Sequence, residues 1–163
     1  MAFFFFISFV ILLRIGELIL ARSNGQWLLK HGAIEYGQKH YPFMIALHTL
    51  FFISLITEYT LAGTGSYNYL LLILFFILIA LKAWTILSLG RFWNTKIYRA
   101  PNFPLIKKGP YKYFKHPNYI IVIAEIAIIP LAFGLYYTAI IFTLLNSIML
   151  FVRIKEENKV LKI

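Results

Sequence analysis

Hydrophobic residues occur along the chain in five long runs separated by short polar stretches. Three runs have about the 20 residues that a helix needs to cross a bilayer: Phe3–Ala21, Pro42–Ala62 and Tyr69–Leu89. Two shorter runs, Tyr119–Phe133 and Leu135–Val152, are separated by a single glycine. The pattern predicts an all-α, polytopic membrane protein with about five transmembrane helices. The last two helices either cross fully or form a short hairpin that returns to its starting side.

We expect one membrane-embedded domain over residues 1–163, because no repeat or linker divides the chain. It contains three transmembrane helices in 1–90, a connecting loop at 91–118, a helical hairpin at 119–152 and a tail at 153–163. The first run lacks a basic n-region and an A-x-A-like cleavage site, so we interpret it as a retained helix rather than a signal peptide.

Composition narrows the class of protein. Of the 163 residues, 61% are hydrophobic and 13% are charged, whereas soluble domains carry about 25% charged residues. This excludes a soluble globular enzyme, a disordered tail and a disulfide-stapled module. The chain has no cysteine, which excludes a cysteine nucleophile and cysteine-ligated metal sites, and we expect no metal site of any kind.

The positions of the positive charges predict the orientation. The chain has 16 Lys and Arg residues, and 14 of them fall in segments that a five-pass chain places on one side. By the positive-inside rule, the basic loops and the C-terminus face the cytoplasm, in a multi-pass protein of the cell membrane. The net charge of +10 is thereby explained by orientation, with anionic membrane lipids as partners rather than nucleic acid.

Four charged side chains and one histidine fall inside the first three runs, where charges are costly. Arg14 and Glu17 are three residues apart, so they form a local ion pair or line a substrate site. For His48 we expect a hydrogen bond between helices. Glu58 lies near the predicted outer end of its helix and should be solvent-exposed, and Lys82 should extend to the cytoplasmic face.

The last two runs each carry a polar stripe. Asn118 and Glu125 share one helix face, and so do Asn146, Arg153 and Glu157. A carboxylate inside an apolar run must face protein or a polar cavity, so the two stripes suggest a shared pocket. Since two glutamates follow Arg153 by three and four residues, an intrahelical ion pair is the alternative.

The segment 105–119 has the densest chemistry in the chain. Gly109 and Pro110 predict a turn, and His116–Pro117 predicts the start of a helix with proline in its first position. The N-terminus of a helix carries unpaired amides and a partial positive charge, which suit an anionic group. Tyrosines and lysines surround this point. From the residues alone, both an interfacial anchor and an active site remain open.

The motif Gly-Pro-Tyr-x-Tyr-x-x-His-Pro-x-Tyr from Gly109, followed by a hairpin and by Arg-x-x-Glu-Glu from Arg153, resembles the isoprenylcysteine carboxyl methyltransferase family. These are integral-membrane enzymes that use S-adenosylmethionine. Lys115 departs from the pattern, since the family usually has arginine before His-Pro. The N-terminal part is similar to the short bacterial branch, whose members are associated with type III polyketide synthases and O-methylate alkylpyrone-type lipids.

The resemblance implies which residues form the site. The residues that it assigns to the cofactor are Tyr111, His116, Pro117, Tyr119 and Glu157. Arg153 would orient the nucleophilic oxygen of the acceptor, with Glu156 and Glu125 as further catalytic residues. The residues expected to bind the substrate are Arg14, Glu17, His40, His48 and Asn146. An enol or phenol-like acceptor also needs a base, for which Glu125, His40 and His48 are unranked candidates.

Together these features predict an S-adenosylmethionine-dependent methyltransferase that acts on an oxygen of a lipophilic small molecule of the alkylpyrone or polyketide type. Its function would be linked to a type III polyketide synthase. Carboxyl methylation of a prenylated cysteine and N-methylation of a phospholipid headgroup are the enzymatic alternatives. A non-enzymatic carrier or assembly partner is the alternative of another class.

Overall fold

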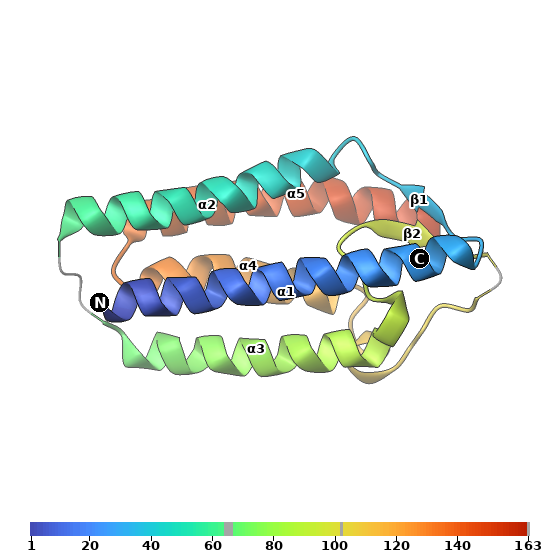
Figure 1. Cartoon of the computed structure of the whole chain (residues 1–163), viewed down its shortest axis with the longest axis horizontal. Helices are drawn as coiled ribbons and strands as arrows, with labels where there is room; N and C mark the ends of the chain where they lie inside the picture. The colour runs from blue at the N-terminus through green and yellow to red at the C-terminus, as the bar shows by residue number, and fades with distance from the viewer. Residues whose placement is uncertain (64–66, 102, 163) are drawn as a thin grey trace.

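The structure, a computed structural model, describes residues 1–63, 67–101 and 103–162. Within these ranges the chain folds into five α-helices that run alternately in opposite directions along one bundle (Figure 1). They are α1 (Ala2–Lys30), α2 (Tyr41–Ala62), α3 (Tyr69–Leu89), α4 (Pro117–Leu131) and α5 (Tyr136–Leu161). The predicted all-α, polytopic fold is confirmed.

Four of these helices, α1, α2, α3 and α5, are long and apolar enough to cross a membrane. Helix α4 has 15 residues and therefore spans about 22 Å. Its C-terminal end nevertheless reaches the level at which α3 begins. This is shown by the hydrogen bond, 2.9 Å long, from the backbone N–H of Asn68, just before α3, to the carbonyl of Ala132, just after α4. The α4–α5 turn thus lies at the same end of the bundle as the α2–α3 link, which fits a complete crossing rather than a hairpin that turns back midway.

The sequence predicted that Glu58 is solvent-exposed, but in the structure it makes specific contacts with α5. Its carboxylate accepts hydrogen bonds from the backbone N–H groups of Tyr137, at 3.1 Å, and Thr138, at 2.7 Å. These amides belong to the first turn of α5, where no intrahelical acceptor exists for them. Glu58 therefore ties the end of α2 to the start of α5.

Two helices are longer than their hydrophobic runs. Helix α1 continues past Ala21 to Lys30, and α5 continues to Leu161, so most of the expected C-terminal tail is helical. The polar end of α1 is anchored by Asn24, whose amide donates to the carbonyl of Trp93 at 2.8 Å. This hydrogen bond to the connection between α3 and α4 thus stabilises the part of α1 that extends beyond its apolar run.

A small antiparallel sheet, absent from the expectations, joins the two basic connections. Strand β1 (Ile34–Tyr36) pairs with β2 (Ile97–Arg99). The facing residues Glu35 and Tyr98 also contact through their side chains, since the Tyr98 hydroxyl donates to Glu35 Oε2 at 3.2 Å. Burial and the neighbouring Glu35 carboxylate raise the pKa of Tyr98 to about 12.

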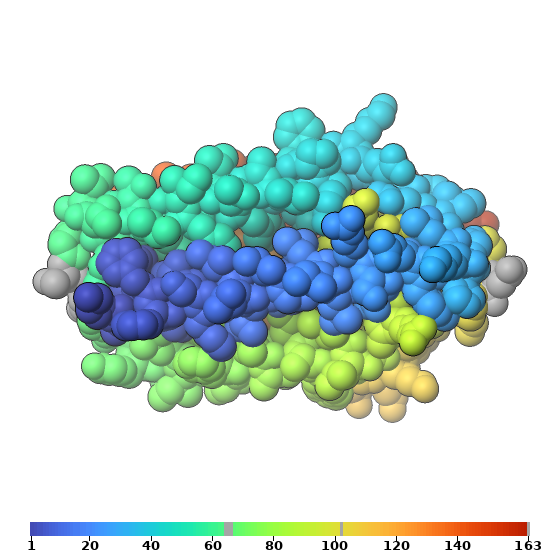
Figure 2. All heavy atoms as spheres, in the orientation of Figure 1, coloured from blue at the N-terminus to red at the C-terminus, as the bar shows by residue number. Residues whose placement is uncertain are grey.

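The apolar core occupies the end of the bundle away from the sheet. Its buried side chains come from all five helices and include Phe3, Leu55, Phe75, Ile129 and Phe142. Many large apolar side chains point outward instead, as expected for helices facing lipid. Figure 2 shows α1 lying across one face of the molecule, between α2 and α3. The three basic segments gather at the opposite end, as their distribution predicted (Figure 1).

Candidate functional site

The main cavity lies at the basic end of the bundle and has a volume of about 580 Å³. Its walls come from the end of α3, the connection between α3 and α4, the first residues of α4 and the end of α5. Because α4 is short, the preceding segment folds over its N-terminal end. The cavity therefore forms where the sequence places its densest chemistry.

The turn at Gly109 fixes this segment against α3. Gly109 has a φ of +53° and begins the short 3₁₀ helix η2 (Gly109–Lys112). A Cβ atom built at Gly109 would lie 2.1 Å from Ser88 Oγ and 3.1 Å from Trp84 Nε1. Both the backbone conformation and the close approach to α3 therefore require glycine at this position.

A chain of polar contacts forms one wall of the cavity. The Tyr119 hydroxyl donates to Glu157 Oε2 at 2.5 Å, and Arg153 Nε donates to the Tyr119 hydroxyl oxygen at 3.2 Å. His116 Nδ1 lies 3.6 Å from Glu157 Oε2, and its Nε2 lies 2.8 Å from Asn158 Oδ1. Helices α4 and α5 thus hold an imidazole, a phenol, a carboxylate and a guanidinium in mutual contact.

Arg153 lies behind Tyr119, on the side away from the cavity. It is 5% exposed, and its Nη2 donates to the carbonyl of Thr95 at 2.6 Å while Nη1 lies 3.1 Å from Met44 Sδ. In the described residues, no ion pair joins Arg153 to either glutamate that follows it on α5. The intrahelical alternative is therefore not what the structure contains, and Arg153 instead connects α5 with α2 and the segment before β2.

Tyr111 contributes a second phenol to the cavity wall. Burial raises the pKa of Tyr111 well above its ordinary value, and the nearby Glu157 carboxylate raises it further. The phenol therefore stays protonated at neutral pH and can donate a hydrogen bond to a bound ligand.

The structure brings most of the expected cofactor residues together. Tyr111, His116, Tyr119 and Glu157 all line the cavity, and Pro117 is buried as the first residue of α4. Glu156 does not line it; its carboxylate lies 3.7 Å from Lys159 Nζ, one helical turn further along α5. Sequence reasoning missed the groups that hold this wall in place, namely Met44, Thr95 and Asn158.

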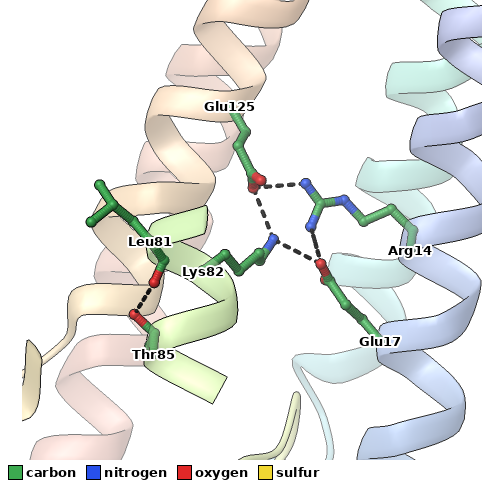
Figure 3. Close-up of polar contacts among 6 residues, drawn as sticks. All are labelled: Arg14, Glu17, Leu81, Lys82, Thr85 and Glu125. Carbon is green, nitrogen blue, oxygen red and sulfur yellow. Dashed lines mark hydrogen bonds and ion pairs between the residues drawn. The ribbon is translucent and has the colours of Figure 1, made fainter. Parts of the chain in front are cut away.

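A second polar cluster lies within the bundle and joins three helices (Figure 3). Glu125 Oε2 on α4 lies 2.7 Å from Arg14 on α1 and 2.8 Å from Lys82 on α3. Glu17 completes the cluster, at 2.8 Å from Arg14 and 3.3 Å from Lys82. We call these four residues the charge network; its two positive and two negative groups balance each other.

The charge network corrects two expectations and confirms another. Lys82 does not extend to the membrane surface, because its side chain is 3% exposed and paired with two carboxylates. The local Arg14–Glu17 pair exists but is part of a larger set. Glu125 faces protein, as expected, but it does not line the main cavity. One residue of each polar stripe, Asn118 and Glu157, does line it, so the expected shared pocket is formed in part.

The other expected substrate residues lie apart from the cavity. His48 Nδ1 lies 2.8 Å from the carbonyl of Met44 on its own helix, so the expected bond between helices is wrong. His40 is the residue at the N-terminal cap of α2. Asn146 is 1% exposed, and neither polar atom of its amide has a partner among the described residues. The assignment of these three residues to substrate binding stays a prediction.

Comparison with known sequences identifies the family. The model of the isoprenylcysteine carboxyl methyltransferase (ICMT) family matches residues 70–163, more than half of the chain. The chain belongs to the ICMT family. The match contains α4, α5, all of α3 except its first residue and, apart from Leu28, every described residue that lines the cavity. Membership in the ICMT family indicates a membrane methyltransferase.

Two relatives extend the similarity over nearly the whole chain. The uncharacterized protein YpbQ of Bacillus subtilis (strain 168) is 44% identical over 162 residues, which cover 98% of this chain and 96% of that protein. An uncharacterized protein of Haemophilus influenzae is 29% identical over 153 residues, covering 91% and 88% of the two chains. No solved structure matches the chain. Helices α1 and α2, outside the family match, are thus shared with these ICMT-family relatives.

Proposed function

We propose that this ICMT-family protein transfers a methyl group from S-adenosylmethionine to an oxygen of a lipophilic small molecule of the alkylpyrone type. The observation that carries the proposal is the position of Tyr119, which lines the cavity on one side and contacts the buried Arg153 on the other. A polar cofactor in the cavity and an acceptor beside Arg153 would then meet at this residue.

The cavity residues suit this cofactor. Its volume of about 580 Å³ falls within the range of about 300–1,000 Å³ that small-molecule sites occupy. Glu157 offers a carboxylate for ribose hydroxyls or an ammonium group, while Phe92 and Phe103 offer apolar surface for a planar base. When bound, the cofactor supplies an electrophilic methyl group on a sulfonium, and the chain's residues supply alignment and electrostatics.

The contacts of Arg153 suit an acceptor that approaches from the apolar part of the bundle. Three contacts of its guanidinium are occupied, by Tyr119, Thr95 and Met44. Since a guanidinium has five N–H donors, donors remain for an oxyanion of the acceptor. For a hydroxyl acceptor, the proton can leave through the Tyr119 hydroxyl to Glu157, because a hydrogen bond of 2.5 Å already joins them.

The cofactor half of the proposal is tested by calorimetric titration of S-adenosylhomocysteine into the purified protein. Glu157→Gln should weaken binding by roughly tenfold to a hundredfold, because it removes a charged hydrogen-bond acceptor from the cavity. Glu156→Gln is the matched control, since it makes the same change on the adjacent residue outside the cavity, and it should bind as the wild type does. Equal affinity in both variants would contradict the site, and no binding to the wild type would favour a non-enzymatic carrier.

The acceptor half is tested with radiolabelled S-adenosylmethionine and three lipid classes: long-chain alkylpyrones, prenylated cysteine and phosphatidylethanolamine. We expect label in the alkylpyrone, the kind of product that a type III polyketide synthase would supply. Arg153→Lys should then lower kcat strongly with little change in cofactor affinity, because lysine keeps the charge but loses the planar fork. Labelling of another class would replace the proposed acceptor, and normal turnover in Arg153→Lys would remove Arg153 from catalysis.

We also propose that the cavity opens toward the cytoplasm, where the cofactor is made. Support comes from the basic segments that surround it at one end of the bundle. Single cysteines introduced at Lys39, Lys108 and Lys162 of this cysteine-free chain should resist a membrane-impermeant maleimide in intact cells and react after lysis. Labelling of any of the three in intact cells would reverse the orientation.

A further inference from the structure

A second cavity, also of about 580 Å³, lies between the end of α1 and the end of α3, where the 3₁₀ helix η1 (Gly90–Phe92) begins. We call it the α1–α3 groove. Among the residues that the structure describes, it shares no lining residue with the main cavity. Figure 2 shows the end of α1 beside the end of α3 on the face toward the viewer. The groove is thus a separate feature of the outer surface.

The lining of the groove changes from apolar to cationic along the helices. Leu20 and Leu87 line its inner part and are 40% and 78% exposed, as expected of side chains that face lipid. Lys30 and Arg91 line its outer part, at the last turn of α1 and in η1. From Leu20 to Lys30 the α1 axis rises about 15 Å, enough to pass from acyl chains to headgroups.

The groove carries positive charge without a compensating carboxylate. None of the six glutamates lines it. Two belong to the charge network, and Glu35, Glu58, Glu156 and Glu157 have partners elsewhere. Among the residues that the structure describes, neither Lys30 nor Arg91 forms an ion pair. The two cations are therefore available to an external anion.

Contacts around the groove hold this geometry before any ligand binds. The guanidinium carbon of Arg91 lies 5.6 Å from the ring centre of Trp27, a cation–π contact across the groove. The buried Asn24 donates to the carbonyls of Gly90, at 3.3 Å, and Trp93, at 2.8 Å. These bonds fix η1 against α1, so a ligand need not order the groove itself.

We propose that the α1–α3 groove binds one anionic phospholipid, with its phosphate between Lys30 and Arg91 and its acyl chains along Leu20 and Leu87. An arginine fork and a lysine suit a phosphate oxyanion, and the outward-facing leucines continue into the space that lipid tails occupy. Two uncompensated cations favour a headgroup with net negative charge over a zwitterionic one, since a choline or ethanolamine group would add a third positive charge.

The test uses the full-length, delipidated protein in detergent and counts bound lipid by native mass spectrometry. Phosphatidylglycerol should bind at least about tenfold more tightly than phosphatidylcholine of the same chain length, the effect of one charged hydrogen bond. Lys30→Gln/Arg91→Gln should remove this preference. Lys39→Gln/Lys155→Gln removes the same charge from exposed positions outside the groove and should keep it.

Three results would overturn the proposal. They are an unchanged preference in the groove variant, an equal loss in the control variant, and full displacement of phosphatidylglycerol by an equal concentration of inorganic phosphate. The conservative exchange Lys30→Arg/Arg91→Lys should retain preference, which guards against a folding defect in the groove variant. Because none of these measurements uses the methyl-transfer reaction, their outcome is independent of the proposed function.

Discussion

Removing the Glu125 charge should be the most destabilising single isosteric change in the charge network. Glu125 is fully buried and its Oε2 atom is shared by Arg14 and Lys82. Glu125→Gln keeps the shape but leaves the buried Lys82 and the partly buried Arg14 with one carboxylate, that of Glu17. Breaking a buried ion pair from one side costs about 3–5 kcal/mol. At about 2–4 °C per kcal/mol for a chain of this size, the midpoint of thermal unfolding should fall by about 6–20 °C.

Comparing single and double variants tests the balance of charges in the network more directly than one substitution does. Lys82→Met leaves the network with one uncompensated negative charge and should also destabilise. The double variant Lys82→Met/Glu125→Gln retains the Arg14–Glu17 pair alone, which is neutral. It should therefore be more stable than the sum of the two single effects allows, by about 0.5–3 kcal/mol. Glu17→Gln should cost less than Glu125→Gln, since the Glu17 side chain is 17% exposed and that of Glu125 is 0% exposed.

The assay is thermal unfolding of all four variants and the wild type in one detergent at one scan rate, followed by circular dichroism. S-adenosylhomocysteine affinity, measured on the same preparations, separates the two candidate roles of Glu125. If the network is structural, affinity changes little at temperatures below the transition. Additive effects in the double variant would refute the reasoning, because they would mean that the charges do not compensate each other across the helices.

Three further predictions concern single contacts. Gly109→Ala should lower both the unfolding midpoint and the affinity for S-adenosylhomocysteine, because the new Cβ would lie 2.1 Å from Ser88 Oγ and the left-handed backbone costs about 1–2 kcal/mol. Gly16→Ala is the control and should be neutral or stabilising, because no described atom lies within 4 Å of its Cβ. Equal behaviour of the two variants would contradict the packing argument. Glu58→Ala should lower the free energy of unfolding by about 0.5–2 kcal/mol, the usual value of a helix cap. Thr57→Ala changes the exposed neighbouring residue and should lower it less, and equal unfolding midpoints of the two variants would mean that the cap contributes nothing. The pKa of Tyr98 is about 12 in the folded state against about 10 in the unfolded chain, so folding favours the neutral phenol. The contribution of this shift to the free energy of unfolding is complete below about pH 10 and disappears as the pH approaches about 12. Between about pH 10 and 12 the unfolding midpoint of Tyr98→Phe should therefore fall less than that of the wild type, and parallel curves would rule out Tyr98 as the cause.

The sequence predicted what depends on long apolar runs and on the distribution of charge. Both are properties of whole segments, so the five helices and the common end of the basic segments followed from counting. The Pro117 start of α4 followed from local backbone chemistry. His116 and Tyr119 were assigned to the cofactor site by the resemblance to the ICMT family, since local chemistry left an interfacial anchor and an active site both open.

What the sequence did not predict depends on which helices are neighbours. Lys82 and Glu125 are 43 positions apart, and no pattern in one sequence indicates that α3 and α4 present them to each other. The Glu58 cap of α5 and the contact between Arg153 and Thr95 have the same origin. The β1–β2 pair was missed because three-residue strands are too short for alternation to appear.

A single layer of side chains separates the main cavity from the α1–α3 groove. Leu28 and Phe92 line the cavity, whereas their chain neighbours Trp27 and Arg91 line the groove. The Trp27 and Phe92 rings touch edge to face across this layer, with centroids 5.6 Å apart. A ligand in the groove and a ligand in the main cavity would therefore contact opposite sides of the same layer of side chains. If the groove holds a phospholipid as proposed, the affinity of the main cavity for S-adenosylhomocysteine should therefore differ between delipidated protein in detergent and the same protein in a membrane that contains anionic lipid.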